Sequence, residues 1–248
     1  MGEELTEAGG KTRLYVPGDL GQDVAVSLAQ GQAHYLLNVL RAKSGNLVLL
    51  FNGRDGEWLA QIVQTDKRGL SAKCLRPSKA QRAVPDIWLA FAPIKKTPSD
   101  YLVQKATELG ASCILPVFTR RTIVGRINTE RMAANAVEAA EQSGRLSVPE
   151  VRQAVTLDSL LRAWPSERRL FFCDEGGDAQ PLAKSARDQS GPAAILTGPE
   201  GGFDPTERKA LRELDFVAPV SLGPRILRAD TAALAGLAIW QSVRGDWG

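Results

Sequence analysis

Two glycine-rich segments in the last third of the chain carry the residue types that most directly indicate chemistry. One spans residues 196–203 (LTGPEGGF) and the other residues 221–231 (SLGPRILRADT). Glycine lets a backbone approach a ligand closely or adopt positive φ, and proline stiffens the loop that contains it. Each segment follows a short apolar run and opens into a helix-like stretch. Two such units side by side predict a crevice for an adenosine-type ligand.

Neither segment matches the common phosphate-binding patterns. The Gly-Lys-Ser/Thr end of a P-loop is missing, and so is the Gly-x-Gly-x-x-Gly spacing of a dinucleotide fold. A nucleotide-phosphate binding module is therefore disfavoured. Either loop alone could be a tight turn before a capped helix, but both together favour a ligand site.

The elements around these loops alternate between strand-like and helix-like patterns. Asp204 and Glu207 flank Pro205 in a strong helix-start signature. Such alternation predicts an α/β domain, a mostly parallel sheet with helices on both faces. Apolar runs cover 87–92, 113–118, 170–173, 193–196 and 216–220, and helical patterns cover 98–109, 129–143, the stretch from 205 onward and 231–243.

The sequence pattern of the N-terminal part is different. It predicts short strands with one helical stretch around residues 32–40. Residues 52–56 (NGRDG) give a hairpin signal between two of the strands. Short strands at close spacing predict a small β-barrel. The expected strands are 13–16, 46–51, 57–63 and 69–75; the expected organisation is a disordered tail at 1–12, a barrel domain at 13–78, a linker at 79–85 and the α/β domain at 86–248.

The composition further limits the kinds of site and of protein that this chain can represent. Cys74, Cys113 and Cys173 are widely spaced and His34 is the only histidine, so we expect no metal site and no disulfide framework. No apolar run has the length of a membrane span, and the acidic N-terminus lacks the features of a secretory signal, which makes a cytoplasmic location the expectation.

Charge is unevenly distributed along the chain. Residues 11–82 hold eleven Lys and Arg against five Asp and Glu. A basic N-terminal part favours a polyanionic partner such as nucleic acid, or it merely aids solubility, and charge alone does not decide between these interpretations.

The two glycine-rich segments resemble those of the ribosomal RNA small subunit methyltransferase E family, which are 16S rRNA (uracil-N3)-methyltransferases of the SPOUT superfamily. The resemblance extends through most of the chain, from about Arg13 to Val243. Further similar segments occur upstream, at Lys95-Lys96, 104–110 (QKATELG), Glu138 with 141–145 (EQSGR), and 34–41 (HYLLNVLR).

This resemblance implies a C-terminal SPOUT domain with a trefoil knot, an N-terminal PUA-like barrel, a homodimer and 16S rRNA of the small ribosomal subunit as partner. It also implies S-adenosylmethionine as cofactor. The implied cofactor-binding residues are Cys173, Leu196, Thr197, Gly198, Pro199, Glu200, Gly201, Gly202, Ser221, Leu222, Gly223, Ile226 and Leu227. A Gly201→Val substitution is expected to block the backbone approach to the cofactor.

Methylation of uracil N3 requires that the nitrogen lose its proton as the methyl group arrives. Arginine suits the stabilisation of negative charge on the base, because it stays cationic and offers several donors to carbonyl oxygens. We therefore predict Arg228 as a catalytic residue. Asp230, where many members of the family have Glu, could orient Arg228 or accept the proton; it could also cap the final helix.

RNA contacts are predicted on both domains. His34 could also be a core-edge residue, Lys105 could pair with Glu108, and the segment around Glu141 could be a solvated helix face. Arg120 and Arg121 could extend the basic patch. The predicted RNA-binding residues are Arg13, His34, Arg41, Lys43, Lys95, Lys105, Glu141 and Arg145. The competing hypotheses are a methyltransferase with another RNA target and a non-catalytic RNA-binding relative.

Overall fold

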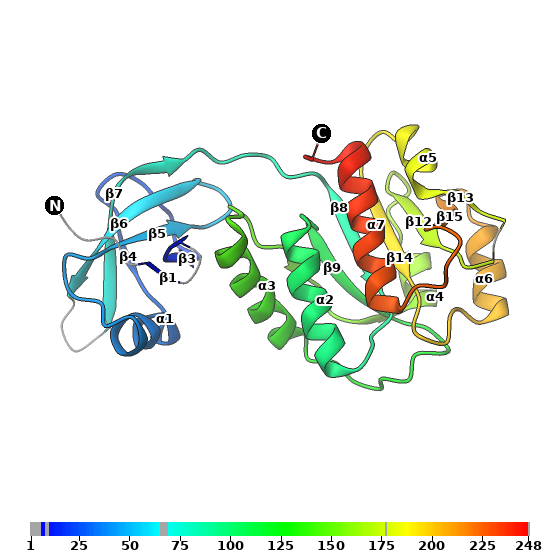
Figure 1. The fold of residues 1–248 in the computed structure, drawn as a ribbon, viewed down its shortest axis with the longest axis horizontal. Coiled ribbons are helices and arrows are strands. Elements are labelled where there is room, and N and C mark those ends of the chain that lie inside the picture. The colour runs from blue at the N-terminus through cyan, green and yellow to red at the C-terminus, as the bar shows by residue number, and fades with distance from the viewer. Residues whose placement is uncertain (1–5, 8–9, 65–68, 177, 248) are drawn as a thin grey trace. The chain divides into compact units, whose positions relative to one another are not determined.

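The computed structural model describes residues 6–7, 10–64, 69–176 and 178–247. The chain forms two compact units, shown in Figure 1. Unit 1 comprises residues 1–83 and 140–148, and unit 2 comprises residues 84–139 and 149–248. The boundary at 83/84 falls within the expected linker at 79–85. The assignment of residues 140–148 to unit 1 has no counterpart in the expected domain organisation.

Unit 1 is built on one curled five-stranded sheet. Its strand order is β3-β5-β6-β7-β4, with β3 parallel to β5 and the other neighbours antiparallel. Alternate residues, among them Leu14, Leu50, Ile62 and Ala72, form its apolar core. The prediction of a small β-barrel of short strands is confirmed to the extent that the short strands form one curled sheet. The strands are β3 (Arg13–Tyr15), β4 (Ala25–Ser27), β5 (Leu47–Phe51), β6 (Glu57–Gln64) and β7 (Leu70–Lys79).

The predicted helical stretch in unit 1 is a short α-helix that continues as a π-helix. Helix α1 spans Gln30–His34 and η1 spans Tyr35–Val39. Leu40 N donates to Tyr35 O at 3.1 Å, a bond between residues five apart. Such π-type turns are frequent at functional sites. The segment ends at Arg41, whose φ of 54° is unusual for a residue with a side chain.

Residues 1–5 and 8–9 of the expected disordered tail at 1–12 lie outside the described residues, whereas residues 6–7 and 10–12 are described. Strands β1 (Thr6–Glu7) and β2 (Gly10–Lys11) pair antiparallel, and Thr12 is fully buried. Strand pairing satisfies the backbone groups of this segment, which composition alone does not reveal.

Unit 2 contains an all-parallel sheet in the order β10-β9-β8-β14-β12-β15-β13, with β11 also paired to β9. The five apolar runs found in the sequence are its five central strands. The strands are β8 (Ile87–Phe91), β9 (Cys113–Phe118), β10 (Glu150–Val151), β11 (Val155–Thr156), β12 (Arg169–Cys173), β13 (Gln180–Pro181), β14 (Ala193–Thr197) and β15 (Val217–Ser221).

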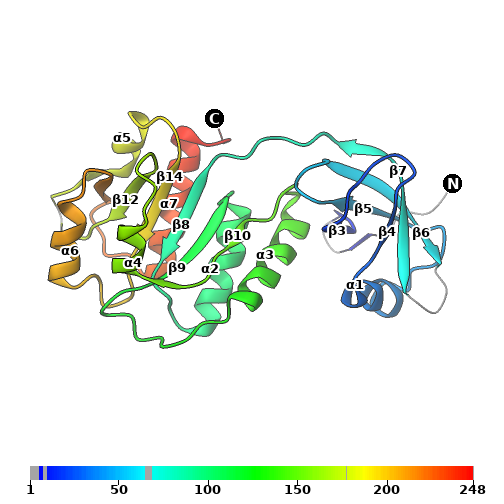
Figure 2. The same ribbon diagram turned by 180° about the vertical axis from the view of Figure 1, so that it is seen from behind.

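Helices cover both faces of this sheet, as predicted. Helices α2 and α7 lie in front of it in Figure 1, and α4 lies in front of it in the reverse view of Figure 2. Leu160 and Leu211 from α4 and α6 pack with Phe172 in one core layer. In the described residues, no helix combines the length and apolarity needed to cross a membrane. The helices are α2 (Lys96–Glu108), α3 (Thr129–Ser143), α4 (Leu157–Arg162), α5 (Leu182–Arg187), α6 (Pro205–Arg212) and α7 (Ala229–Arg244).

The starts of the last two helices differ in how well they were predicted. Helix α6 begins with the expected capping box between Asp204 and Glu207. Helix α7 begins two residues earlier than expected, with Arg228 as its N-cap residue, so the prediction that Asp230 caps it is wrong. Asp230 lies in the first turn, where its Oδ1 accepts a hydrogen bond from Thr231 N at 2.7 Å. A carboxylate there complements the positive end of the helix dipole.

Candidate active site

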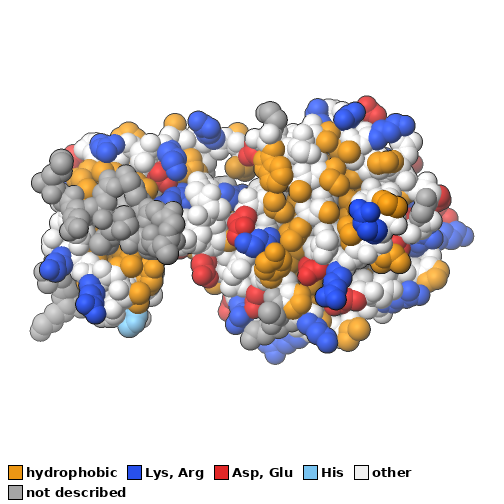
Figure 3. All heavy atoms as spheres, in the orientation of Figure 1, with side chains coloured by type: hydrophobic (Ala, Val, Ile, Leu, Met, Phe, Trp, Pro, Cys, Tyr) orange, Lys and Arg blue, Asp and Glu red, His pale blue; other side chains and the backbone are white. Residues whose placement is uncertain are grey.

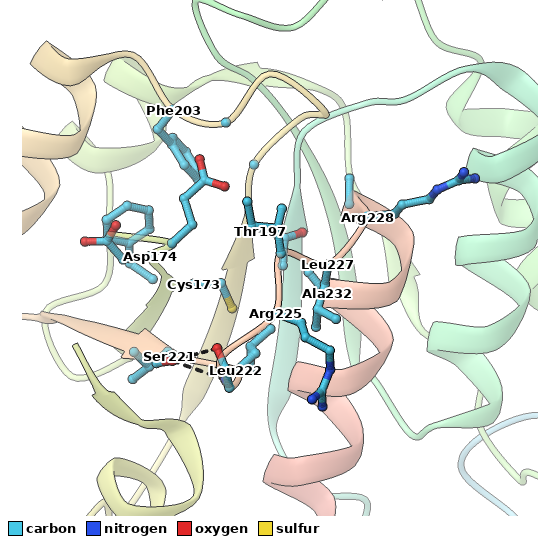
Figure 4. Close-up of a pocket in the computed structure, with 18 of the residues that line it drawn as sticks. Cys173, Asp174, Thr197, Phe203, Ser221, Leu222, Arg225, Leu227, Arg228 and Ala232 are labelled. Atoms are coloured by element: carbon cyan, nitrogen blue, oxygen red, sulfur yellow. Dashed lines mark hydrogen bonds between the residues drawn. The ribbon is translucent and has the colours of Figure 1, made fainter. Parts of the chain in front are cut away.

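A cavity of about 610 Å³ opens at the carboxyl ends of β12, β14 and β15. Parallel strands place their carboxyl ends at one edge of a sheet, and the loops that follow them form a binding crevice there. The three loops and the start of α7 surround the cavity in Figure 4. Its volume is typical of sites for small organic ligands and cofactors.

Most of the residues predicted to bind the cofactor line this cavity, and so does the predicted catalytic Arg228. The structure thus brings together the two glycine-rich segments, which residues 204–220 separate in the sequence. The predicted residues in the lining are Cys173, Thr197, Gly198, Pro199, Glu200, Gly202, Ser221, Leu222, Gly223, Ile226, Leu227 and Arg228.

Leu196 and Gly201 are not among the lining residues. Leu196 is fully buried in the core layer with Phe172. Gly201 faces Arg121: a Cβ on Gly201 would meet the Arg121 side chain at an ordinary 3.7 Å. The expected blocking effect of Gly201→Val therefore has no basis in the geometry of the cavity.

Several lining residues were not singled out from the sequence. Asp174 and Glu175 directly follow the predicted strand at 170–173, so their position at a strand end was the available signal. Phe203, Pro224 and Arg225 lie within the two glycine-rich segments, whereas Arg208 had no local signal because its place depends on how α6 packs. The additional lining residues are Phe172, Asp174, Glu175, Phe203, Arg208, Val220, Pro224, Arg225, Ala229 and Ala232.

Thr197 contributes a hydroxyl group to the cavity. The residue is 1% exposed, and among the described residues no group hydrogen-bonds to its Oγ1. Buried hydroxyl groups are nearly always hydrogen-bonded. The Thr197 hydroxyl therefore lacks the partner that such a group normally has, at a residue that lines the cavity.

Two glycines are required by the close packing of the loop after β14. A Cβ on Gly198 would lie 2.7 Å from the Phe203 ring, and Phe203 packs edge-on against Phe172 with ring centroids 4.9 Å apart. Gly202 has φ of 66°, a conformation that residues with a side chain rarely adopt, and a Cβ there would also meet the Glu175 carboxylate. These contacts fix the backbone of the loop beside the cavity.

The cavity wall at the end of β12 carries a buried carboxylate. Although burial of Asp174 acts to raise its pKa, hydrogen bonds from Arg208 and Arg212 outweigh burial and hold the pKa below its ordinary value. The Asp174 oxygens accept from Arg208 Nε and Arg212 Nε, each at 2.7 Å. Asp174 therefore stays ionised and ties α6 to the end of β12.

The thiol of Cys173 lies in the same wall. Burial raises the pKa of Cys173 to about 12, so the thiol is protonated at neutral pH and is a poor nucleophile. It offers the cavity an uncharged, polarisable surface.

Arginines line the open side of the cavity. Arg225 and Arg228 are exposed, and Ile226 between them is 88% exposed. The Arg228 side chain extends away from Thr197 and Cys173 in Figure 4. A planar substrate that arrives at this opening would meet cationic groups before it reaches the interior.

The predicted RNA-binding residues fall in both units. The structure contradicts the prediction for Arg13. Its Nε donates to Glu57 Oε2 at 2.6 Å, and its other nitrogens donate to the carbonyl groups of Ala140, Glu141 and Arg145 at 2.7–2.9 Å. The Arg13 side chain is only 9% exposed. These bonds occupy the guanidinium, so it is unavailable to a phosphate.

Glu141 has a similar structural role, because its Oε1 accepts from Tyr15 N at 2.9 Å. Its neighbours at 140–148 thereby join the β3 edge of unit 1. Lys105 pairs with Glu108 at 2.7 Å, as one hypothesis expected. Lys95 is exposed at the N-terminus of α2.

His34, Arg41 and Lys43 are exposed on and just after the α1–η1 segment of unit 1. Asn38 Nδ2 lies 2.8 Å from His34 Nδ1. The segment also exposes apolar surface, since Leu37 and Val39 are 46% and 61% exposed. Basic and apolar groups side by side suit contact with the phosphates and bases of RNA. Among the described residues, no group of three His, Cys, Asp or Glu side chains is arranged to hold a metal ion.

Comparison with known proteins identifies the family. An RNA methyltransferase domain matches residues 81–241, and an RNA methyltransferase PUA domain matches residues 28–74. The ribosomal RNA small subunit methyltransferase E of Rickettsia conorii is 33% identical over 229 residues, which are 91% of this chain and 93% of that protein.

Two solved structures share the fold over nearly the whole chain. The ribosomal RNA small subunit methyltransferase E of Neisseria gonorrhoeae, bound to S-adenosylmethionine, has a TM-score of 0.86 at 30% identity and covers 96% of this chain and 99% of its own. A methyltransferase of Legionella pneumophila, also with bound S-adenosylmethionine, has a TM-score of 0.85 at 30% identity and covers 95% and 98%. From its sequence and its fold alike, this chain belongs to the ribosomal RNA small subunit methyltransferase E family.

Proposed function

We propose that this protein is an S-adenosylmethionine-dependent methyltransferase that methylates N3 of a uridine in 16S rRNA of the small ribosomal subunit. The observation that carries this proposal is the cavity of about 610 Å³ formed by both glycine-rich loops in a chain of this family. Its relatives carry the rRNA methyltransferase name, and two solved relatives hold S-adenosylmethionine.

The residues of the cavity fit this cofactor. The unpartnered Thr197 hydroxyl offers a hydrogen bond to a polar ligand atom, and the backbone around Gly198 and Gly202 leaves no side chain between loop and ligand. Leu222, Leu227 and Ala232 supply apolar surface for a purine ring. When bound, S-adenosylmethionine supplies an electrophilic methyl group on a sulfonium.

Arg228 is our candidate for stabilising the uracil anion. It lies at the opening of the cavity, stays cationic, and can donate to the carbonyl oxygens that flank N3. Asp230 remains the candidate for orienting Arg228 or for accepting the N3 proton, although it lies outside the cavity lining. The α1–η1 segment with His34, Arg41 and Lys43 is our candidate RNA contact in unit 1, and Lys95 and Lys105 are candidates in unit 2.

We further propose that the protein acts as a homodimer. Hydrophobic side chains gather over the part of unit 2 that carries α2 and α7 (Figure 3), where Tyr101 is 47% exposed. Exposed apolar surface of this kind is typical of interaction sites. Analytical ultracentrifugation of the purified protein tests this proposal, and a sedimentation coefficient that corresponds to the monomer at all concentrations would rule it out.

Methylation of small subunits that lack the modification tests the function. The protein is incubated with such subunits and radiolabelled S-adenosylmethionine, and the labelled nucleoside is identified by mass spectrometry. An N3 methyl group also blocks the Watson–Crick edge of uridine, so reverse transcription should stop at the modified position. Label in a different nucleoside, or in another RNA only, would favour a different target. Binding of RNA without cofactor binding or methyl transfer would favour the non-catalytic alternative.

An Arg228→Ala variant tests the catalytic assignment. We expect the turnover number to fall by about 100-fold or more, the effect typical of removing one donor to a developing anion. The affinity for S-adenosylmethionine should remain near that of the unmodified protein in calorimetric titration. Full activity of this variant would remove Arg228 from the mechanism.

A further inference from the structure

The loop that leaves β9 contacts the glycine-rich loop after β14 at Gly201, a residue that does not line the cavity. Arg121 Nη1 donates to Gly201 O at 2.9 Å, and the aliphatic part of Arg121 lies against Gly201. Gly198 to Glu200 and Gly202 line the cavity whereas Gly201 does not. Arg121 therefore contacts the cofactor loop at a residue outside the cavity lining.

The backbone at this contact has unusual freedom. The peptide that joins Gly201 to Gly202 has no side chain on either side, and ordering consecutive glycines costs more conformational entropy than ordering other residues. Within the loop, Gly202 N donates to Pro199 O at 2.9 Å, which closes a turn. From outside the loop, the Arg121 guanidinium donates to the Gly201 carbonyl and so fixes its direction.

The backbone of the turn that carries Arg121 is held in place. Thr119 and Thr122 form a turn in which Thr119 N donates to Thr122 Oγ1 at 2.9 Å. Arg120 N donates to the buried carboxylate of Glu207 at 2.8 Å, and the other oxygen of Glu207 accepts from Asp204 N. The turn after β9 thus contacts the glycine-rich loop at Gly201 and also contacts the start of α6, where that loop ends.

We propose that Arg121 is a positioning residue for cofactor binding: by holding the Gly201 carbonyl outward, it orders the inner surface of the loop before the ligand arrives. This inference rests on the proposed function, because it assumes that the cavity takes S-adenosylmethionine. A preordered loop binds more tightly because it loses less conformational freedom on binding.

The test compares three variants by calorimetric titration with S-adenosylmethionine. Arg121→Met keeps the aliphatic packing but removes the donors, and Arg121→Lys keeps a cationic donor. Arg126→Met makes the same charge change at an exposed position of the same loop. We expect Arg121→Met to raise the dissociation constant by about three- to tenfold, the effect of one charge-assisted hydrogen bond at an exposed site. Because the contact uses one donor nitrogen, Arg121→Lys should recover part of the affinity, and Arg126→Met should bind normally.

Steady-state kinetics and thermal unfolding distinguish a positioning role of Arg121 from a general loss of structure. Arg121→Met should raise the KM for S-adenosylmethionine while kcat at saturating cofactor and the unfolding midpoint stay unchanged. An unchanged dissociation constant in Arg121→Met, or an equal loss in Arg126→Met, would overturn the inference. A fall in the unfolding midpoint of Arg121→Met that tracks the loss of affinity would also overturn it. Absence of binding by the unmodified protein would instead contradict the proposed function.

Discussion

Replacement of Asp174 by Asn tests how the cavity wall at the end of β12 is held. The Asp174 side chain is 1% exposed and accepts from two arginines at 2.7 Å and from Gly176 N at 3.1 Å. Asn keeps one acceptor oxygen but loses the charge and turns an amide group toward one of the arginines. The variant therefore loses at least one charge-assisted hydrogen bond.

The expected loss of stability in Asp174→Asn depends on how exposed Arg208 and Arg212 are. A hydrogen bond to a charged group contributes about 1.5–3 kcal/mol, and breaking a fully buried ion pair costs about 3–5 kcal/mol. Arg208 and Arg212 are 38% and 30% exposed and regain water when Asp174 is neutralised, which lowers the cost. We therefore expect a loss of about 2 kcal/mol at pH 7, or about 4–8 °C in the unfolding midpoint of unit 2.

The effect should depend on pH. Because the pKa of Asp174 in the folded state lies below its ordinary value of 3.8, its stabilisation is fully present above that value and is lost as pH falls through the folded pKa. The difference between the unmodified protein and Asp174→Asn should stay constant from neutral pH down to about pH 5 and shrink below about pH 4.

Thermal unfolding followed by circular dichroism across this pH range is the assay. Asp178→Asn is the matched control: Asp178 pairs with Arg212 at 2.5 Å but is 63% exposed, so little change is expected. If Asp174→Asn melts with the unmodified protein at pH 7, or if the gap between them persists undiminished at pH 2.5, the reasoning about this buried carboxylate is refuted.

Two further substitutions address other parts of the structure. Gly198→Ala should abolish measurable S-adenosylmethionine binding in calorimetric titration, because its Cβ would lie 2.7 Å from the Phe203 ring, whereas Gly201→Ala should bind normally; equal affinities would contradict this distinction. Arg13→Met should lower the stability of unit 1 by about 3 kcal/mol, because it leaves the fully buried Glu57 without its main partner. Chemical denaturation measures this loss, and an unchanged midpoint would show that Arg13 is dispensable to the fold.

Much of the fold of unit 2 could be predicted because its signals are local. Each of the five central strands is a short apolar run, and the parallel arrangement follows from the helical segments between the runs. The start of α6 was predicted for the same reason, since Asp204, Pro205 and Glu207 act within one helical turn. The start of α7 was not, because Asp230 fits both the cap and the first turn, and only the path of the preceding loop decides between them.

The sequence predicted which two segments form the site, but not which of their residues face the ligand. The glycine-rich loops and Arg228 could be recognised in the sequence, and so could their common location, since parallel strands bring their carboxyl ends together. The trefoil knot remains a prediction from the resemblance. Which face of the loop meets the ligand depends on neighbours far away in the sequence. Arg121 contacts the loop at Gly201, which does not line the cavity, and Phe203 packs close to Gly198, which does.

The sequence by itself determined the residue types, the order of the elements and the family to which they belong. The sequence predicted that Arg13 contacts RNA. Only the tertiary structure decided that Arg13 instead donates hydrogen bonds to Glu57 and to carbonyl groups more than 120 residues away. It likewise decided that Asp174 is paired with Arg208 and Arg212 from α6. The physical reason is that periodicity and capping act over a few residues, whereas the partner of a charge is set by burial and packing between distant segments.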